Sequence, residues 1–560
     1  MTDAAEQGRA ALLEWRARQP TNWYTSDPDL ALTMRARLGP ERYEAERPRL
    51  VAAGEMVATR LLPLAELTNQ DENLPRLERW SGLGQRVEEV VFHPAYHEAG
   101  RLIWETGVIA DYAEPGRETL QLALFHLFAQ GGENGHQCPL ACTAGLVKVL
   151  RAAGTEDQRA RYLPRLLARD YSQRLHASQF LTEVQGGSDV GANSAVARPE
   201  GDGFRIHGEK WFCSVIDAGA FLLTARPEGA PGGTRGLGLF LVPRTLEGRP
   251  NGFSVRRLKR KLGTRAMASG EADFDGALGE LLGPLDRGFK LVVEHVLDTS
   301  RLYNAVACAG SARAAWREAS SYARHREAFG RAIAEYPLVQ ETIALLRAEA
   351  LALTSASLRI AARGDQLALG RPGADDELAH RVAVNVAKYW TAVRSTQCVR
   401  SAMEVLGGNA TIETFTPLVR LYRDAMVLES WEGAHNVLVQ QITRDAARLG
   451  AHRPFLAELG EALGRLQLPG AEAEIARVRG GLESLERGFT LLAEVEGEQR
   501  LARRVVDQAG VVLALVAMLE ELAVDPADAA RRGAIQLIAD RFLAPELERS
   551  RPLPAALLAP

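Results

Sequence analysis

The sequence has few cysteines and no long apolar run, and each shortage argues against a class of protein. Five cysteines occur among 560 residues, an odd number scattered through apolar segments: Cys138, Cys142, Cys213, Cys308 and Cys398. This usage is typical of reduced thiols in a cytoplasm and argues against a disulfide framework. No uninterrupted apolar run reaches the roughly 18 residues that a membrane-spanning helix needs. Since "MTDAAEQGRA" also lacks the features of a signal peptide, we expect a soluble cytoplasmic protein with no membrane partner.

Charge of one sign is also missing. The 67 basic and 71 acidic side chains leave a net charge of −4, which gives no overall attraction to nucleic acid or to a membrane surface. A local patch remains compatible with this balance. The composition, 46% hydrophobic and 25% charged, predicts a well-cored chain of two to four domains.

Familiar cofactor and metal motifs do not occur. No G-x-G-x-x-G follows a strand-like run and no G-x-x-x-x-G-K-[ST] is present, so neither a Rossmann dinucleotide site nor a P-loop is indicated. His93 and His97 are four residues apart, but Pro94 lies between them and no H-E-x-x-H occurs, so we expect structural histidines and no metal site. Cys138 and Cys142 are expected to pack in a core.

Four segments of different texture predict a mainly α fold with a central β domain. Residues 1–176 carry helix-period apolar patterning, as in "ETLQLALFHLFAQ", and are predicted to be all helical. Residues 177–290 turn to short runs such as "AFLLTARP" and "FSVRRL", separated by glycine and proline, and predict a compact β domain. Long helical stretches in residues 291–445 suit an antiparallel bundle. Residues 446–560, which contain no lysine, predict an appended helical domain.

Several short stretches could carry chemistry, although each also has an ordinary structural explanation. "LTEVQGGSDV" (181–190) offers glycines that let backbone N–H groups approach a ligand, but it also fits a simple turn. "GEKWFCS" (208–214) fits aromatic core on a strand. "RHREAFG" (324–330) fits a solvated helix end. "MEVLGG" (403–408) and "RLYRDAMVLESWEGAHN" (420–436) complete the set.

Taken in this order, the stretches resemble the acyl-CoA dehydrogenase superfamily of flavoproteins. The family elements are T-E-x-x-x-G-S-D, K-x-W-x-T, R-x-x-F-G, a glycine pair, R-D-A and aromatic-E-G. They are carried here, with phenylalanine and serine in place of the W and T of the second element, by Thr182, Glu183, Gly187, Ser188, Asp189, Lys210, Phe212, Ser214, Arg326, Phe329, Gly330, Gly407, Gly408, Arg423, Asp424, Ala425, Trp431, Glu432 and Gly433. "VFHPAYH", "LKRKLGTRAMAS" and "SWEGAHN" resemble the AidB-like, alkylation-response branch. A C-terminal helical extension is also a feature of that branch.

The resemblance implies a fold and a cofactor. The expected fold has N-terminal helices, a β-barrel domain, a C-terminal four-helix bundle and an extra C-terminal helical domain. FAD would lie between the β domain and the bundle without a Rossmann fold. Its flavin side would be bound by Leu181, Thr182, Gly187, Ser188, Phe212, Ser214, Trp431, Gly433 and Asn436. Its pyrophosphate and adenosine would be bound across a dimer interface by Arg326, Phe329, Gly407 and Gly408, in a tetramer built as a dimer of dimers.

Two positions depart from the family pattern at the adenosine end. Pro337 stands where many relatives have a glutamine after R-x-x-F-G, and Glu404 replaces the glutamine usual before the paired glycines. Arginine still suits a pyrophosphate, because its planar fork is permanently charged, and glycine permits the close approach that a phosphate needs.

Glu432 has two interpretations. It precedes the helical run "NVLVQQITRD", where a first-turn carboxylate would be stabilised by the helix dipole by ~0.3 to 1 kcal/mol. In the family, the glutamate of this element removes the α-proton of an acyl thioester while the β-hydride passes to flavin N5. Such a base has to be positioned and desolvated, which raises its pKa. The resemblance also implies that Ser188 and Arg301 contact the substrate, although Arg301 would equally fit a helix-surface ion pair.

Two functions therefore remain open. One is an FAD-dependent acyl-CoA dehydrogenase that passes electrons to an electron-transfer flavoprotein. The other is an AidB-like flavoprotein that mainly binds or protects DNA. Residues 445–560 hold 14 arginines, no lysine and 18 acidic residues, which is the wrong balance for a DNA-binding domain. DNA binding is thus implied by the resemblance alone.

Overall fold

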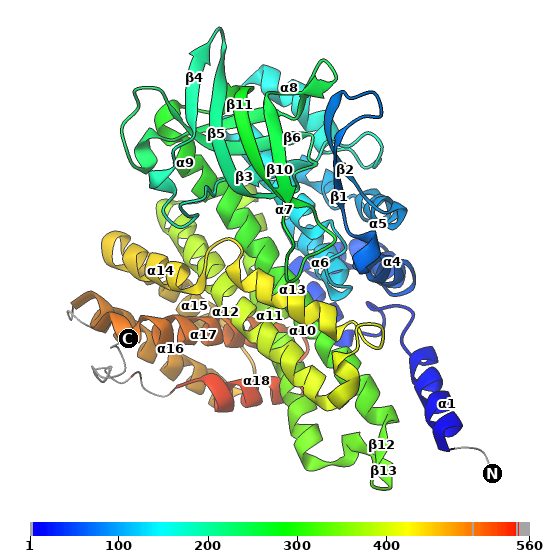
Figure 1. Cartoon of the computed structure of the whole chain (residues 1–560). Helices are drawn as coiled ribbons and strands as arrows, with labels where there is room; N and C mark the ends of the chain where they lie inside the picture. The colour runs from blue at the N-terminus through cyan, green and yellow to red at the C-terminus, as the bar shows by residue number, and fades with distance from the viewer. Residues whose placement is uncertain (1–3, 495–497, 545–546, 548–560) are drawn as a thin grey trace, which may run out of the picture.

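The computed structural model describes residues 4–494, 498–544 and 547. Figure 1 shows a β domain at one end of the molecule and long bundle helices running away from it. The N-terminal helices lie along one side of the bundle and the C-terminal extension lies against the other. The predicted fold class, mainly α with a central β barrel and extra C-terminal helices, is confirmed.

The N-terminal region is mostly helical. Its α-helices are α1 (Ala4–Ala17), α2 (Pro28–Leu38), α3 (Pro40–Met56), α4 (Leu62–Thr68), α5 (Pro94–Glu105), α6 (Glu118–Gln130), α7 (Gln137–Ala153) and α8 (Glu156–Leu166). The apolar run "ETLQLALFHLFAQ" forms α6 as the periodicity predicts, and its side chains from Thr119 to Gln130 are all buried. A helix buried on every face belongs to the interior of a large core.

The prediction that residues 1–176 are all helical is wrong at one place. Strands β1 (Arg76–Trp80) and β2 (Arg86–Val91) form an antiparallel hairpin closed by a turn at Gly84. Both strands are short and carry charged side chains on exposed positions, so the sequence has no regular apolar spacing there that would indicate a buried strand. Their contribution to the structure is a bridge from the N-terminal helices to β10 of the β domain.

The β domain is a closed ring of strands. Its sheet strands are β3 (Ala177–Phe180), β4 (Val196–Glu200), β5 (Gly203–Ser214), β6 (Ala220–Pro227), β7 (Gly238–Pro243), β10 (Phe253–Leu258) and β11 (Ser269–Leu281). The order β11-β5-β4-β6 is closed by β7, which pairs with both β6 and β11. β10 extends the ring beyond β11, and β3 lies parallel to β6. Phe180, Phe221 and Phe240 fill its interior.

Three long helices form the bundle next to the barrel: α10 (Asp298–His325), α11 (Pro337–Leu369) and α12 (Ala374–Leu406). The shorter α13 (Leu418–Ser430) packs on α12 and α10. Small residues let these helices approach one another closely. At Gly310 of α10, a Cβ atom would lie 2.7 Å from the backbone oxygen of His126 in α6. The position therefore requires glycine.

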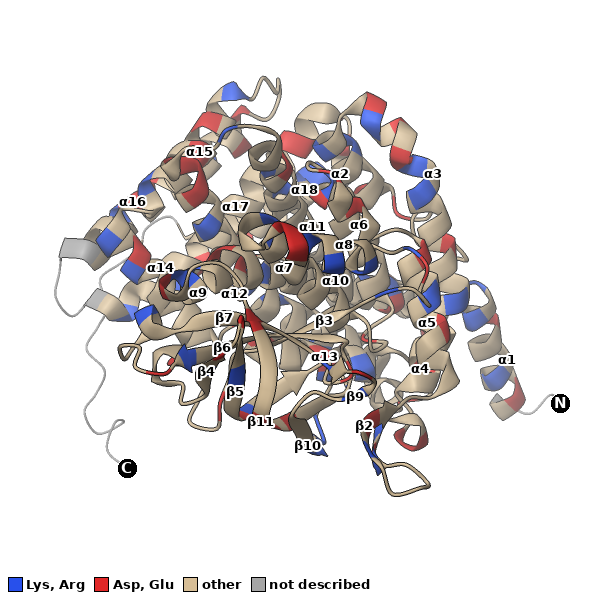
Figure 2. Ribbon diagram, turned by 90° about the horizontal axis from the view of Figure 1, so that it is seen from above, with Lys and Arg blue, Asp and Glu red and all other residues tan. Residues whose placement is uncertain are grey.

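Residues beyond α14 (His435–Leu449) form a helical extension: α15 (His452–Arg465), α16 (Glu472–Glu494), α17 (Ala502–Val524) and α18 (Ala529–Phe542). α17 is apolar and almost entirely buried, because it packs against α11, α12 and α2. Its side chains belong to the same hydrophobic core as the bundle. Figure 2 shows basic and acidic residues interleaved on the outer helices of the extension. In the described part of the chain, no helix is long and apolar enough to cross a membrane.

Candidate active site

Glu432 lies in the short loop between two helices of the bundle. α13 ends at Ser430 and α14 begins at His435, so Glu432 is outside the first turn of α14 and the helix-dipole interpretation does not describe its position. Its backbone is left-handed (φ +57°), an unusual conformation for a residue with a side chain, and such strain is often found at functional positions. The side chain reaches β3 of the barrel, where Gln179 Nε2 donates to Glu432 Oε1 at 3.0 Å.

The electrostatic environment of Glu432 makes it a weaker acid than usual. Burial raises the pKa of Glu432, while the positive charges of Arg301 and Lys388 and the hydrogen bond from Gln179 oppose that rise. The net direction is upward. Lys388 is fully buried in α12, and burial lowers its pKa to about 8. A carboxylate with a raised pKa beside cations that can balance its charge suits a general base.

Arg301 and Lys388 fix the loop by donating hydrogen bonds to its backbone carbonyl groups. Arg301 is only 4% exposed, and its Nε donates to the backbone oxygen of Glu432 at 3.0 Å. Its Nη1 donates to Asn385 Oδ1 at 2.6 Å. Lys388 Nζ donates to the backbone oxygens of Glu429 and Gly433, at 2.9 and 2.8 Å. The alternative of a helix-surface ion pair for Arg301 is excluded, because the residue is buried and bound to the loop.

Gly433 completes this loop and requires glycine for two reasons. Its φ of +118° is a conformation that other residues rarely adopt. A Cβ atom there would also lie 3.3 Å from Leu438 and 3.8 Å from Arg301 Nη2. Trp431, on the other side of Glu432, is partly buried and packs against both hydrophobic clusters, the one in the barrel and the one in the bundle. The loop therefore sits where the two parts meet.

The segment containing Leu181, Thr182, Gly187 and Ser188 forms a loop directly after β3. Asn193 Nδ2 donates to the backbone oxygen of Leu181 at 2.7 Å, and the backbone N–H of Trp211 donates to the backbone oxygen of Thr182 at 2.9 Å. Gly187 folds back on Thr182, since an added Cβ would lie 2.5 Å from Thr182 Oγ1. The loop thus has one defined shape that leaves Ser188 exposed.

A buried ion pair between Glu183 and Lys210 fixes that loop to β5. Lys210 Nζ lies 2.8 Å from Glu183 Oε1, and both side chains are almost completely buried. The same carboxylate accepts from the backbone N–H and the hydroxyl of Ser194, at 2.6 and 2.8 Å. Burial alone would raise the pKa of Glu183, but Lys210 and the hydrogen bonds outweigh it and lower the pKa to about 2. These two motif residues therefore have a structural role.

Phe212 and Ser214 end the same strand. Phe212 is 56% exposed, whereas Lys210, two positions earlier on the same strand, is buried. Lys259 Nζ lies 3.5 Å from the centroid of the Trp211 ring and 4.9 Å from that of Phe212. Ser214 Oγ and Ser269 Oγ are 3.2 Å apart. An exposed aromatic face next to hydroxyls suits a flat polar ligand.

A second group of buried charges lies between the N-terminal region and α13, and it escaped the sequence analysis in part. Asp424 accepts backbone N–H groups from Glu133 at 3.1 Å and from Thr264 at 2.6 Å. Burial and the charge of Asp424 raise the pKa of Glu133 to about 7. Burial lowers the pKa of Lys261 to about 8. Asp424 was visible in the R-D-A element, whereas Glu133 had only the turn-rich "GGENG" as a signal.

The four residues predicted to bind the adenosine end of FAD lie away from the loop of Glu432. Arg326 and Phe329 are at the hairpin of β12 (Glu327–Ala328) and β13 (Arg331–Ala332), at the end of the bundle opposite the barrel (Figure 1). Phe329 is 97% exposed. Gly407 and Gly408 follow α12 in a turn that leaves open space around both Cα atoms.

Asn436 is in the first turn of α14, where its side chain is bound by the extension. Arg503 Nη2 of α17 donates to Asn436 Oδ1 at 2.5 Å. Gln179, Lys388 and Asn385 were missed by the sequence analysis, because no motif or spacing connects β3 and α12 with the W-E-G element. The one available signal was Lys388 itself, a lysine within the apolar helix "VAVNVAKYW".

Comparison with known proteins identifies the family of this chain. The chain matches the description "Adaptive response protein AidB N-terminal domain" over residues 16–173, and the middle and C-terminal domains of acyl-CoA dehydrogenases over 178–277 and 286–447. "Putative acyl-CoA dehydrogenase AidB" of Escherichia coli K12 is 33% identical over 415 residues, covering 70% of this chain and 73% of that protein. "Acyl-CoA dehydrogenase family member 11" of Caenorhabditis elegans is 31% identical over 441 residues, covering 76% and 70%.

A solved structure extends the similarity to almost the whole chain. Caenorhabditis elegans ACDH-11 in complex with C11-CoA superposes with a TM-score of 0.84 at 27% identity, covering 95% of this chain and 93% of that one. The match therefore includes the extension as well as the barrel and the bundle. This chain is an acyl-CoA dehydrogenase-like enzyme and belongs to the acyl-CoA dehydrogenase family, with an AidB-type N-terminal domain.

Proposed function

We propose that this protein is an FAD-dependent acyl-CoA dehydrogenase in which Glu432 removes the α-proton of an acyl thioester. The observation that carries the proposal is the position of Glu432. Its carboxylate has a raised pKa, is hydrogen-bonded to Gln179 of the barrel and is backed by Arg301 and Lys388 of the bundle. A general base needs both a fixed position and a pKa closer to the operating pH than that of an ordinary carboxylate.

The surrounding residues assist this proton transfer in different ways. Gln179 orients the carboxylate through Oε1 and leaves Oε2 available for the α-proton. Arg301 and Lys388 stabilise the ionised form of Glu432 and fix the loop through its carbonyl oxygens. When the proton moves to Glu432, the carboxyl becomes neutral, which its buried setting favours. The product would be a 2-enoyl thioester.

The residues around this loop fit FAD. When bound, the flavin of FAD supplies the oxidant that accepts the β-hydride of the substrate at N5. Phe212 offers an exposed aromatic face, and the loop after β3 offers the hydroxyls of Thr182 and Ser188 with glycines that allow a close approach. Leu181, Gly187, Ser214, Trp431, Gly433 and Asn436 complete the flavin side of the proposal. Asn436 would contact the flavin together with Arg503, which donates a hydrogen bond to the side-chain oxygen of Asn436.

The adenosine end of FAD would be bound by a neighbouring subunit through Arg326, Phe329, Gly407 and Gly408. Their exposure and their distance in the fold from Glu432 support a role outside their own subunit's active site. Ser188 and Arg301 remain the proposed substrate residues, with Arg301 acting through the backbone of Glu432. We further propose an electron-transfer flavoprotein as the acceptor of the electrons.

The substrate class is an acyl-CoA. The relative ACDH-11 was solved with C11-CoA, and the similarity of 0.84 in TM-score covers the regions that carry the site. The decisive experiment is to mix the purified flavoprotein anaerobically with acyl-CoAs of different chain lengths and to record loss of the oxidised flavin absorbance. Bleaching by at least one acyl-CoA, with the 2-enoyl-CoA as product, is expected. Purified protein that binds FAD but is not reduced by any acyl-CoA would contradict the proposal.

A further inference from the structure

Two adjoining cavities lie on the side of α10 that faces the extension, away from Glu432. The larger, of about 530 Å³, lies between α10, α11 and α18. The smaller, of about 440 Å³, lies between α10 and the segment that joins α1 to α2. They share three lining residues, Trp316, Ser320 and Arg324, and so lie side by side; the two together are called the trough. No residue of the proposed active site lines either part.

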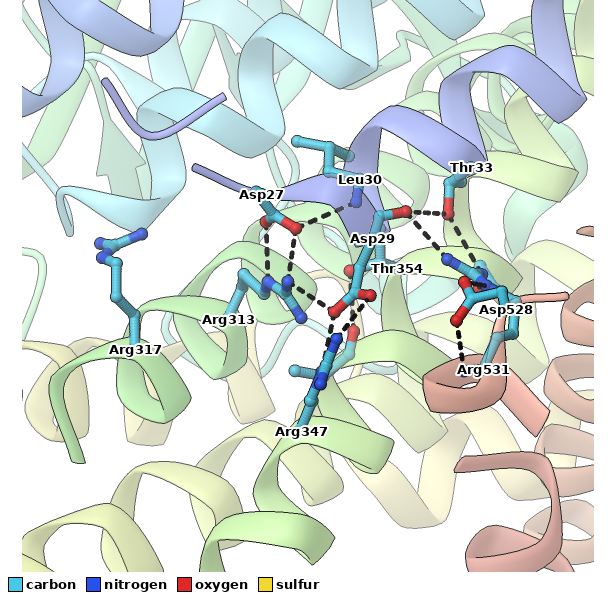
Figure 3. A network of polar contacts seen from close by, with 12 residues as sticks. Asp27, Asp29, Leu30, Thr33, Arg313, Arg317, Arg347, Thr354, Asp528 and Arg531 are labelled. Atoms are coloured by element: carbon cyan, nitrogen blue, oxygen red, sulfur yellow. Dashed lines mark hydrogen bonds and ion pairs between the residues drawn. The ribbon is translucent and has the colours of Figure 1, made fainter. Parts of the chain in front are cut away.

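Arginines outnumber carboxylates in this trough. Arg313 and Arg347 both bind Asp29, and Arg313 also binds Asp27, as Figure 3 shows. Arg317 and Arg324 also line the trough, but neither forms an ion pair in the described part of the chain. Arg18 lines the trough as well and pairs with Glu14, so five guanidinium groups face three carboxylates.

The two uncompensated arginines have only neutral partners. Arg317 donates to the side-chain oxygen of Gln130 and lies 3.5 Å from the centroid of the Trp23 ring. Arg324 Nη1 donates to Ser320 Oγ at 2.6 Å. Burial lowers the pKa of Arg317 to about 9, and the nearby charges of Glu318 and Asp27 offset only part of that effect. A surplus of two positive charges therefore remains in the trough.

Hydrogen-bond donors without partners are found at the same place. Arg313 is 3% exposed, and its Nη1 has no partner among the described residues although Nε and Nη2 are bound to Asp27. The indole Nε1 of Trp316 is likewise buried and has no partner in the same part of the chain. Buried donors of this kind are rare because each one lost its water without a replacement. An anionic ligand in the trough would supply acceptors.

The other half of the trough is apolar. α11 contributes Ile343, Ala344 and Ala348, and α18 contributes Ala534 and Leu537. Alanine and glycine leave a channel between the two helices. Gly533 also lines it, and a Cβ atom added at Gly533 would meet nothing within 4 Å. The ligand that fits has a charged group at one end and an apolar body at the other.

The trough is separate from the proposed adenosine end. Tyr322 of α10 accepts a hydrogen bond from Asn409, which follows the Gly407–Gly408 pair. Ser320 and Arg324 are each two residues from Tyr322, so at about 100° per residue they lie on the opposite side of the helix. An occupant of the trough would therefore not replace the FAD of a neighbouring subunit.

We propose that this trough binds a phosphate monoester with a short apolar body. A phosphate monoester carries close to two negative charges at neutral pH, which matches the surplus of two arginines. Guanidinium groups bind phosphate oxygens with two parallel hydrogen bonds, and Arg317 and Arg324 are the groups free to do so. The apolar body lies between α11 and α18, where it links the bundle to the extension.

The test uses the full-length, FAD-loaded protein and isothermal titration with hexyl phosphate and methyl phosphate. Arg324→Gln is expected to weaken the binding of both compounds by on the order of tenfold, because it removes a charged donor. Arg317→Gln should do the same. Gly533→Leu should weaken hexyl phosphate but not methyl phosphate, since the new side chain fills the apolar half alone. Arg371→Gln, which changes an exposed arginine in the α11–α12 loop, is the matched control.

The outcome does not depend on catalysis, because flavin reduction by acyl-CoA should be unchanged in Arg324→Gln and Gly533→Leu. Lack of saturable hexyl phosphate binding by the parent protein would overturn the proposal. Equal loss in Arg324→Gln and Arg371→Gln would also overturn it, since binding would then follow net charge and not the trough. Sedimentation at each ligand concentration excludes self-association as the source of the heat.

Discussion

Glu432 and its loop are held by contacts from three directions, and each comes from a different part of the chain. Gln179 reaches it from the barrel, Arg301 binds its backbone from α10, and Lys388 binds the carbonyls on either side from α12. A base fixed in this way loses little orientation between turnovers. The loop can adopt its left-handed turn because Gly433 follows Glu432.

The variant Glu432→Gln tests whether Glu432 is the catalytic base or only supports the structure of the loop. The amide keeps the shape of the side chain but cannot accept the α-proton, so flavin reduction by an accepted acyl-CoA should fall by ~10² to 10⁴ while FAD stays bound. Rapid-mixing absorbance measures the rate and the flavin spectrum measures the cofactor. Glu429→Gln is the matched control, because its side chain lies 3.7 Å from His435 and away from Gln179. Reduction at the parental rate in Glu432→Gln would refute the assignment.

The direction of the stability change in Glu432→Gln also follows from the pKa of Glu432. A carboxyl whose pKa is raised by folding is destabilising once it ionises, above its unfolded pKa of about 4.3. At pH 7 this cost is present in the parent, and Gln removes it. The melting temperature of Glu432→Gln should therefore not fall, so that lost activity cannot be ascribed to unfolding.

Lys388 should control the pH dependence of the reaction. Glu432 has to be ionised to act, so activity is expected to fall as the pH drops through its pKa, which burial places above the ordinary glutamate value of about 4.3. Lys388 lowers that pKa, so Lys388→Met should move the acid limb of kcat/KM to higher pH. Because the pKa of Lys388 is about 8, the difference should vanish at higher pH.

The control for this prediction is Lys290→Met, which removes an exposed lysine paired with Glu294 at 3.4 Å. A purely structural role for Lys388 would lower the rate equally at all pH values. An acid limb that stays in place in Lys388→Met would therefore show that the charge of Lys388 does not act on Glu432.

The loop after β3 depends on one ion pair, which explains why T-E-x-x-x-G-S-D and K-x-F-x-S occur together. Glu183 of the loop and Lys210 of β5 are buried against each other at 2.8 Å. Lys210→Met leaves Glu183 buried and unpaired, which should destabilise the fold by ~3 to 5 kcal/mol and loosen FAD. Glu183→Gln combined with Lys210→Met should recover much of that loss, because no unpaired charge remains. Denaturant unfolding and FAD affinity measure both effects.

This stabilisation should also resist acid. The folded pKa of Glu183 is lowered to about 2, so its contribution is present above the unfolded value and fades only as the pH falls from about 4 towards 2. If the parent is no more stable than the double variant at pH 6, the ion-pair explanation is contradicted.

Strands and helices could be predicted from the sequence wherever burial of one face gives the apolar residues a regular spacing. "AFLLTARP" and "FSVRRL" coincide with β6 and β10, and "ETLQLALFHLFAQ" coincides with α6. The β1–β2 hairpin was missed because its residues are mostly exposed and charged. The contacts of Gln179 and Lys388 with the loop could not be predicted, since they depend on how β3 and α12 pack. Residues 446–560 remain a predicted domain, yet α17 lies in the core of the bundle.

The packing of the extension on the bundle can be tested by adding one methyl group at their contact. Gly510 of α17 lies against α12, where an added Cβ would be 2.3 Å from the ring of Trp390. Gly510→Ala should therefore push α17 away from α12 and lower stability by ~1 to 3 kcal/mol. Gly480→Ala in α16 is the control, because a Cβ there meets nothing within 4 Å. It should be neutral or stabilising by up to ~1 kcal/mol, since alanine favours helix.

The same packing bears on DNA binding, the alternative function. Several arginines of the extension already have partners inside the protein. Arg503 binds Asn436, Arg531 is buried in an ion pair with Glu521, and Arg477 binds Asp540. Basic and acidic residues are also interleaved along its helices (Figure 2). Only weak, salt-sensitive attraction to a phosphate backbone follows from such a surface.

In the proposed function, FAD is bound completely only when subunits assemble. Arg326 is exposed at the far end of the bundle, so in the proposed site it would bind the pyrophosphate of another subunit's FAD. Arg326→Gln should therefore lower FAD affinity on the order of tenfold while Glu432 and its contacts stay unchanged. Arg331→Gln on the same hairpin, where the guanidinium lies 4.1 Å from the Tyr336 ring centroid, should retain FAD. Sedimentation of the parent should show a dimer of dimers, and a monomer that keeps stoichiometric FAD would contradict the shared site.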